Sequence, residues 1–137
     1  MSIVNPAVGR HVVRVEWEKV IDIPNGNGRQ LGQTYYRGLF FHEGEVAQAW
    51  AMETFERSPQ GGTQKGLTIN TYADGSSTVM SFWGNKTALG EEARNGFDGA
   101  WEFVNGTGRF EGVSGSGEYE GEAYDGIAYS NVVGNSR

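Results

Sequence analysis

The sequence predicts an all-β protein in which eight short strands form a single antiparallel β-barrel. Glycine occurs 22 times and proline 3 times in 137 residues, where average usage would give roughly 10 glycines. The 4 Trp, 6 Tyr and 7 Phe exclude a flexible low-complexity chain. Many short segments alternate between apolar and polar residues with the period of a strand. Because abundant glycine lets strands bend sharply, it favours a barrel over a sandwich.

The first strand is predicted over 12–23, where a spacing of two places alternate residues on opposite faces. One face holds Val13, Val15 and Trp17, and the other holds Arg14, Glu16 and Glu18. A second strand is expected over 33–42, with Tyr36, Phe40 and His42 on one side. A third is expected over 46–57, because a short link precedes it and helical spacing gives no apolar stripe.

Two strands over 67–72 and 77–83 flank Ala73-Asp-Gly75, which is a hairpin turn signal. The polar segment 58–66 before them is interpreted as a loop. Strand character is missing over 84–96, where residues 88–94 allow at most one helical turn.

A sixth strand is predicted over 97–104, and a repeated unit follows it. Gly106-Thr-Gly-Arg-Phe-Glu-Gly112 and Gly115-Ser-Gly-Glu-Tyr-Glu-Gly121 share glycines, an aromatic and a glutamate at matching positions. We interpret the two units as strands seven and eight, joined as a hairpin. The tail over 127–133 either adds a strand or packs on a partner.

Composition and charge narrow the functional classes. The chain is long enough for one domain with a buried core, and its lack of cysteine excludes disulfides and thiolate metal sites. A net charge of −6 with 11 scattered basic residues argues against a nucleic-acid partner. The first residues lack a run typical of a signal peptide, and no segment has the ~18 apolar residues of a membrane helix. We expect a soluble, cytoplasmic protein.

The segment Gly106-Thr-Gly-Arg-Phe-Glu-Gly-Val-Ser-Gly115 resembles the closing hairpin of the allene oxide cyclase-like barrels, which are related in fold to the dirigent proteins and to bacterial polyketide cyclases. The preceding Asp98-Gly-Ala-Trp-Glu-Phe-Val104 and the Asp74-Gly75 turn fit the same pattern. The resemblance covers roughly the C-terminal half. It implies a calycin-type barrel with an apolar cavity that holds a small hydrophobic or aromatic molecule, often in homo-oligomers that are dimers or trimers.

The same resemblance points to catalytic candidates on the first strand. Plant cyclases carry a cavity glutamate there with a polar residue two positions on, and Glu16 and Glu18 correspond by position. Glu18 stands where those enzymes have an amide. The alternative is that both glutamates form the solvent face of the strand. Glu102, in the middle of a strand, is a further catalytic candidate, and the alternative is that it lies exposed on the barrel surface.

Aromatic and polar residues on the predicted strands are candidates for lining a ligand cavity, since such pockets are mainly apolar with a few polar groups. The predicted substrate-binding residues are Trp17, Tyr36, Phe40, His42, Trp50, Met52, Glu53, Phe82 and Trp101. A packed core is the alternative for the apolar members. With only two histidines, His11 and His42, and no nearby ligand partners, no metal site is predicted.

We therefore expect a cofactor-free cyclase or isomerase that holds a hydrophobic substrate in its barrel and excludes water from it. A non-catalytic carrier or dirigent-like protein with the same cavity is the alternative. A barrel with a filled interior that acts through subunit or partner contacts is the third hypothesis.

Overall fold

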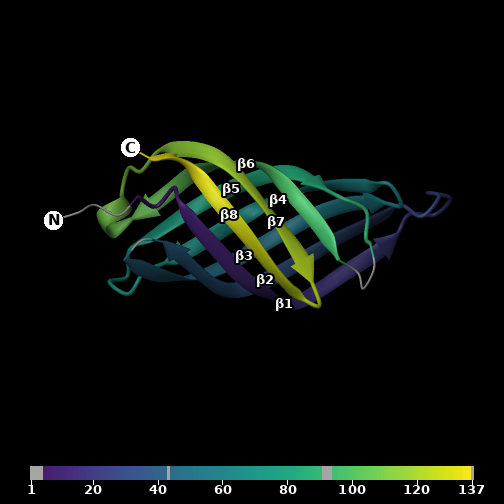
Figure 1. The fold of residues 1–137 in the computed structure, drawn as a ribbon, viewed down its shortest axis with the longest axis horizontal. Coiled ribbons are helices and arrows are strands. Elements are labelled where there is room, and N and C mark those ends of the chain that lie inside the picture. The colour runs from purple at the N-terminus through teal and green to yellow at the C-terminus, as the bar shows by residue number, and fades with distance from the viewer. Residues whose placement is uncertain (1–4, 43, 91–93, 137) are drawn as a thin grey trace.

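The structure, a computed structural model, describes residues 5–42, 44–90 and 94–136 and contains one closed antiparallel barrel (Figure 1). Each strand pairs with its neighbours in sequence, and β8 closes the barrel on β1. The strands are β1 (Gly9–Asp22), β2 (Gln30–His42), β3 (Glu45–Ser58), β4 (Gly61–Thr71), β5 (Ser77–Lys86), β6 (Asn95–Thr107), β7 (Gly115–Tyr124) and β8 (Ile127–Ser136). The predicted all-β, eight-stranded antiparallel barrel is confirmed.

The seventh and eighth strands differ from the prediction. The first glycine unit forms the end of β6, the 3-10 helix η2 (Gly108–Phe110) and a turn, while the second unit lies in β7. Gly108 and Gly112 adopt φ angles of 62° and 79°, a left-handed conformation that turns the chain out of an extended strand. The seventh strand is therefore formed by the second glycine unit, and the eighth strand is formed by the C-terminal tail.

The polar segment predicted as a loop is also largely a strand. β4 begins at Gly61 and pairs with β3 along its whole length. The segment 84–96, in which no strand was predicted, is also partly extended. β5 continues to Lys86, and β6 begins at Asn95. The helical turn considered over 88–94 includes residues 91–93, which lie outside the described residues.

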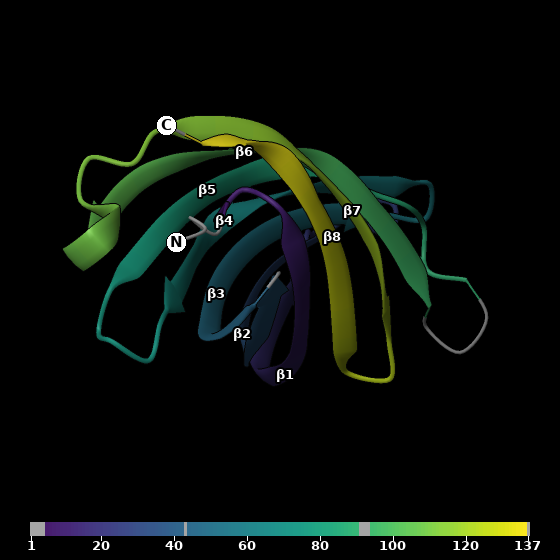
Figure 2. The same ribbon diagram turned by 60° about the vertical axis from the view of Figure 1, so that its left-hand side comes forward.

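The barrel is longer on one side than on the other. β1 pairs with β2 from Arg10 to Asp22 but with β8 only from Gly9 to Arg14. The β1–β2 hairpin consequently projects beyond the β7–β8 hairpin, as Figure 1 shows. Figure 2 shows the same barrel with the end that holds the termini turned forward.

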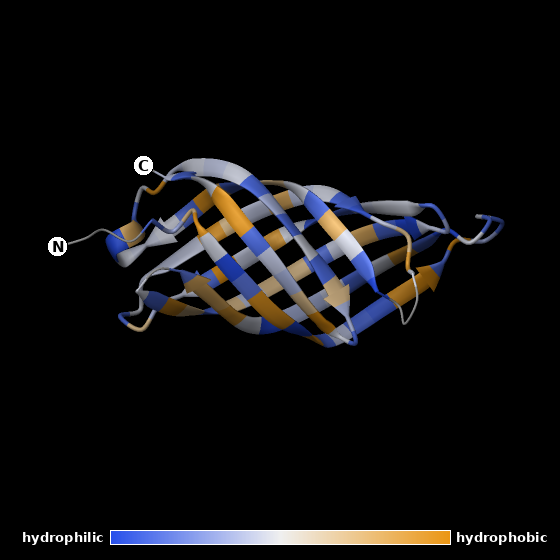
Figure 3. Cartoon of the chain, in the orientation of Figure 1, coloured by the Kyte–Doolittle hydropathy of each residue, from blue (hydrophilic) through white to orange (hydrophobic). Residues whose placement is uncertain are grey.

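Apolar and polar residues alternate along most strands, and Figure 3 shows the resulting bands of hydropathy across the barrel. At the end that holds the chain termini, buried side chains fill the interior. This packed end contains Ala7, Phe40, Ala47, Ala49, Tyr72, Phe103 and Phe110. Toward the opposite end the buried side chains include the polar residues Glu53, Gln64 and Thr68.

A β-bulge changes the facing of residues along β1. Val15 lies opposite Tyr36 and Trp17 lies opposite Tyr35, so that Glu16 is the extra residue between two paired positions. Past the bulge, Trp17 faces outward and Glu18, opposite the buried Thr34, faces inward. The predicted faces of the first strand are therefore wrong beyond Val15, because a bulge displaces the period-two pattern by one residue.

Candidate functional site

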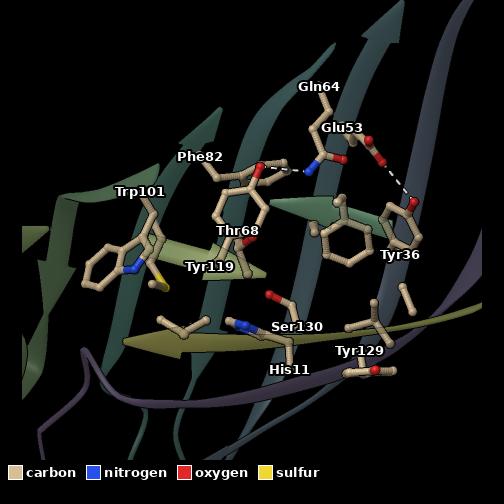
Figure 4. A pocket seen from close by; sticks show the side chains of 16 residues that line it. His11, Tyr36, Glu53, Gln64, Thr68, Phe82, Trp101, Tyr119, Tyr129 and Ser130 are labelled. Carbon is tan, nitrogen blue, oxygen red and sulfur yellow. Dashed lines mark hydrogen bonds between the residues drawn. The ribbon is translucent and has the colours of Figure 1, made fainter. Parts of the chain in front are cut away.

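A cavity of about 90 Å³ lies inside the barrel, from its middle toward the end opposite the termini. Figure 4 shows the side chains that line it. The apolar part of the wall includes Val13, Ala51, Met80, Phe82, Phe97, Trp101, Ala128 and Val132. The polar part includes His11, Tyr36, Glu53, Gln64, Thr68, Tyr119 and Ser130. A mainly apolar wall with a few convergent polar groups is typical of a small-molecule site.

A buried carboxylate lies at the centre of the polar wall. Glu53 on β3 is 2% exposed, and its Oε2 accepts a hydrogen bond of 2.8 Å from the hydroxyl of Tyr36 on β2. Its Oε1 lies 2.9 Å from the ammonium of Lys86 on β5. That oxygen receives no well-aligned hydrogen bond from the described residues. The ion pair offsets much of the cost of burying the charge, and Oε1 keeps capacity to accept a proton or a hydrogen bond.

The tyrosine beside this carboxylate is a hydrogen-bond donor. Burial and the neighbouring charge of Glu53 raise the pKa of Tyr36 far above its usual range. The Tyr36 hydroxyl therefore stays protonated at neutral pH. It offers its proton to an acceptor rather than acting as a phenolate.

A second polar contact crosses the interior. Gln64 Nε2 on β4 donates a hydrogen bond of 2.7 Å to the hydroxyl of Tyr119 on β7. Two paired glycines leave the space for this ring, since a Cβ at Gly84 or Gly99 would lie 2.7 or 2.8 Å from the Tyr119 hydroxyl. Burial raises the pKa of Tyr119 to about 12. The hydroxyl thus remains protonated and is held across the barrel.

Glu18 lies at the rim of this region. Its Oε2 accepts a hydrogen bond of 2.9 Å from Thr34 Oγ1, and its charge contributes to the raised pKa of Tyr36. Glu18 is exposed and does not line the cavity. Glu16 is exposed on the other side of the bulge and pairs with Arg14 at 3.5 Å. The two predicted catalytic glutamates therefore do not share a face.

His11 lies on the wall formed by β1 and β8, where it pairs in register with Ser130. Its Nε2 lies 2.9 Å from Oδ1 of Asn70, a residue with no exposed surface. Burial lowers the pKa of His11 to about 4, even though the Asn70 contact opposes this shift. The imidazole is consequently neutral at physiological pH.

Phe40 and His42, two predicted substrate-binding residues, belong to the packed end instead. The ring of Phe40 stacks between His11 and His42, with centroid distances of 4.3 and 4.9 Å. Both residues are buried outside the cavity. Neither ring nitrogen of His42 has a hydrogen-bond partner among the described residues.

Three further predicted binding residues face outward, away from the cavity. Trp17 and Met52 are 44% and 39% exposed, and Trp50 packs under Arg37. The predicted catalytic residue Glu102 is exposed as well and pairs in register with Ser81. Tyr36, Glu53, Phe82 and Trp101 are the predicted residues that the structure brings together in the cavity wall.

Several lining residues were absent from the predicted set. Gln64 and Thr68 lie on a strand whose first half has no apolar alternation, and Tyr119 lies in the second glycine unit. His11 is the first inward residue of β1 that lines the cavity, but an isolated histidine gives no sequence signal for a binding site. A sequence signal exists in the glycines of β5 and β6, since Gly84 and Gly99 make room for the large inward ring of Tyr119.

No family model matches the chain, and a search of curated proteins found no similar sequence. In the part of the chain that the structure describes, no helix is long and apolar enough to cross a membrane. The described residues also contain no group of three or more His, Cys, Asp or Glu side chains placed to hold a metal ion.

Proposed function

We propose that the barrel binds a small, mainly apolar molecule in its cavity and catalyses its isomerisation or cyclisation without a cofactor. The observation that carries this proposal is the buried carboxylate of Glu53 in a mainly apolar wall, within 2.8 Å of the Tyr36 hydroxyl. A buried acid next to a protonated phenol is a suitable pair for acid–base chemistry on a bound molecule.

In the proposed reaction, Glu53 takes a proton from the substrate through Oε1 and returns it at a second atom of the same substrate. Tyr36 turns its hydroxyl from Glu53 to a substrate oxygen and stabilises the negative charge that forms there. Atoms and electrons balance within the substrate, because the proton that leaves one position is delivered to another. The apolar wall that includes Phe82 and Trp101 holds the molecule in a reactive shape and excludes water.

The first test is to identify the bound molecule. Native mass spectrometry of protein purified gently from the cells that make it, followed by denaturing extraction, should yield an apolar or aromatic compound in stoichiometric amount. Incubation of that compound with fresh protein should then give an isomer of equal mass. Protein that takes up no apolar compound would contradict the proposal.

The second test compares two glutamates. Glu53→Gln should lower turnover by a factor of about 10²–10⁴, the usual contribution of a general acid or base. Glu102→Gln, on the outer face, should leave turnover unchanged and is the matched control. Equal rates in both variants would exclude Glu53 as the catalytic group.

A carrier is the second candidate function, and the Lys86 contact favours it. Glu53 is already paired at 2.9 Å with an ammonium, which is a satisfied resting state for a buried carboxylate. A carrier would release its ligand unchanged, so recovery of the same compound after prolonged incubation distinguishes the two candidates. In either case, we propose that the protein acts in the cytoplasm; whether it acts as a dimer or trimer stays a prediction.

A further inference from the structure

His11 is a polar side chain on a different part of the cavity wall from Glu53. It comes from β1 beside Ser130 of β8, whereas Glu53 and Gln64 come from β3 and β4 (Figure 4). A molecule in the cavity therefore meets a carboxylate and an imidazole from two different parts of the wall. Any role of His11 in recognising that molecule rests on the proposed function, because both concern the same cavity.

The contact with Asn70 sets which nitrogen of His11 carries the proton. Asn70 Nδ2 lies 3.4 Å from Thr78 Oγ1 and 3.5 Å from Met80 Sδ. Because a thioether sulfur accepts but never donates a hydrogen bond, the amide NH₂ belongs on that side. The amide oxygen then faces His11 at 2.9 Å and accepts a hydrogen bond from Nε2–H.

A neutral imidazole protonated at Nε2 has a lone pair at Nδ1. His11 lines the cavity, and no described residue donates to its Nδ1. Both ring nitrogens of His42 are fully buried in the packed end and have no hydrogen-bond partner among the described residues. Nδ1 of His11 is not one of the fully buried atoms that lack a partner. The free acceptor of His11 is thus available to a molecule in the cavity.

The charge and the size of the cavity limit which ligands it can accept. Glu53 is the acidic side chain among the described residues that line the cavity, and no lysine or arginine is among them. A carboxylate or phosphate in the cavity would lie in a mainly apolar space without a cation in the wall to pair with it, which is unfavourable. The volume of about 90 Å³ is below that of an engineered apolar cavity of ~150 Å³ that takes up benzene. The enclosed part of the ligand is therefore no larger than about one ring.

We propose that His11 is a specificity-determining residue of the cavity and that the ligand is a neutral phenol or related hydroxyl-bearing ring whose O–H donates to Nδ1. Asn70 acts as the positioning residue, because it fixes the tautomer that presents this acceptor. Ligands of the same shape without a donor leave Nδ1 unsatisfied and bind less well.

The experiment measures the dissociation constants of phenol and toluene, which are nearly equal in size, by titration followed with protein amide NMR. It compares the full-length protein with His11→Phe and with His42→Phe. Both variants keep an aromatic ring stacked on Phe40, but His42 lies outside the cavity. For each protein, the dissociation constant of toluene is divided by that of phenol. Because the two probes are nearly equal in size, a change in packing affects both constants alike and leaves this ratio unchanged.

This ratio should fall about tenfold or more in His11→Phe and stay unchanged in His42→Phe. If both probes bind but the ratio is the same in all three proteins, the role of His11 is overturned and the binding cavity stands. If neither probe binds the original protein, both the role of His11 and the proposed function are overturned.

A measurement on the unsubstituted protein covers the case in which His11→Phe does not fold. The ¹⁵N chemical shifts of the imidazole report which nitrogen is protonated. Nδ1 should be unprotonated in the free protein, and its shift should change on addition of phenol but not of toluene. A protonated Nδ1 would overturn the proposal, because the wall would then present a donor.

Discussion

The side chain of Gln64 on β4 donates a hydrogen bond of 2.7 Å to the hydroxyl of Tyr119 on β7, across the interior of the barrel. Neighbouring strands are already joined by their backbones, but this contact joins two strands that are not neighbours. It therefore links two parts of the cavity wall, since both side chains line the cavity. Both side chains are buried, at 7% exposure each.

Tyr119→Phe should lower the free energy of unfolding by about 1–3 kcal/mol, because it leaves the buried amide of Gln64 without its acceptor. Tyr124→Phe is the matched control, since Tyr124 is 39% exposed at the end of the same strand. Urea unfolding of both variants checks the prediction. Equal midpoints would show that the amide finds another partner.

Lys86→Met should be strongly destabilising, because Glu53 would remain buried without the ammonium that lies 2.9 Å away. Removal of one member of a buried ion pair costs about 3–5 kcal/mol. Adding Glu53→Gln to Lys86→Met should recover most of this loss, because no unpaired charge is then buried. A double-mutant cycle by chemical denaturation measures the coupling, and additive effects would contradict the pairing.

Stability should fall as the pH is lowered from about 6.5 to about 4. The pKa of His11 is lowered from 6.5 to about 4 in the folded protein, so the unfolded chain binds more protons in this window. The contribution of His11 is present above pH 6.5 and is lost as the pH falls through 4; it is on the order of 3 kcal/mol. The pH dependence of unfolding should be shallower in His11→Phe than in the original protein.

Glu16→Gln should change the free energy of unfolding by less than about 0.5 kcal/mol and leave ligand binding unaffected. Glu16 is exposed, and its contact with Arg14 at 3.5 Å is a surface ion pair. Thermal unfolding and titration with phenol check both parts of this prediction. A large loss of binding in Glu16→Gln would restore the role that its sequence position suggests.

The fold class was predictable because most strands carry a period-two pattern and the Asp74–Gly75 turn has a clear hairpin signal. Gly75 does adopt a positive φ of 87°, and Ser76 N–H donates to Asp74 Oδ1 in that turn. The first half of β4 was missed because its buried inward residue is Gln64. A strand that lines a polar part of a cavity lacks the apolar alternation by which strands are recognised.

The site was less predictable, since it depends on which face of each strand is turned inward. Tyr36 and Glu53 are cavity-lining members of the predicted set, but that set took residues from both faces of β3. Trp50 and Met52 were assigned to the cavity because large apolar side chains usually face inward, yet both lie on the outer surface of β3. Composition alone does not distinguish the two faces of a strand that is apolar on both sides.

The bulge at Glu16 decides how β1 responds to a change in its length. Deletion of Glu16 alone would leave Val15 opposite Tyr36 and Trp17 opposite Tyr35, so both halves of the strand would keep their present facing in one regular ladder. Deletion of another residue of the strand would instead shift one half by one position and turn its inward side chains outward. Glu16 is therefore the position at which β1 becomes shorter without changing the chemistry of the cavity wall.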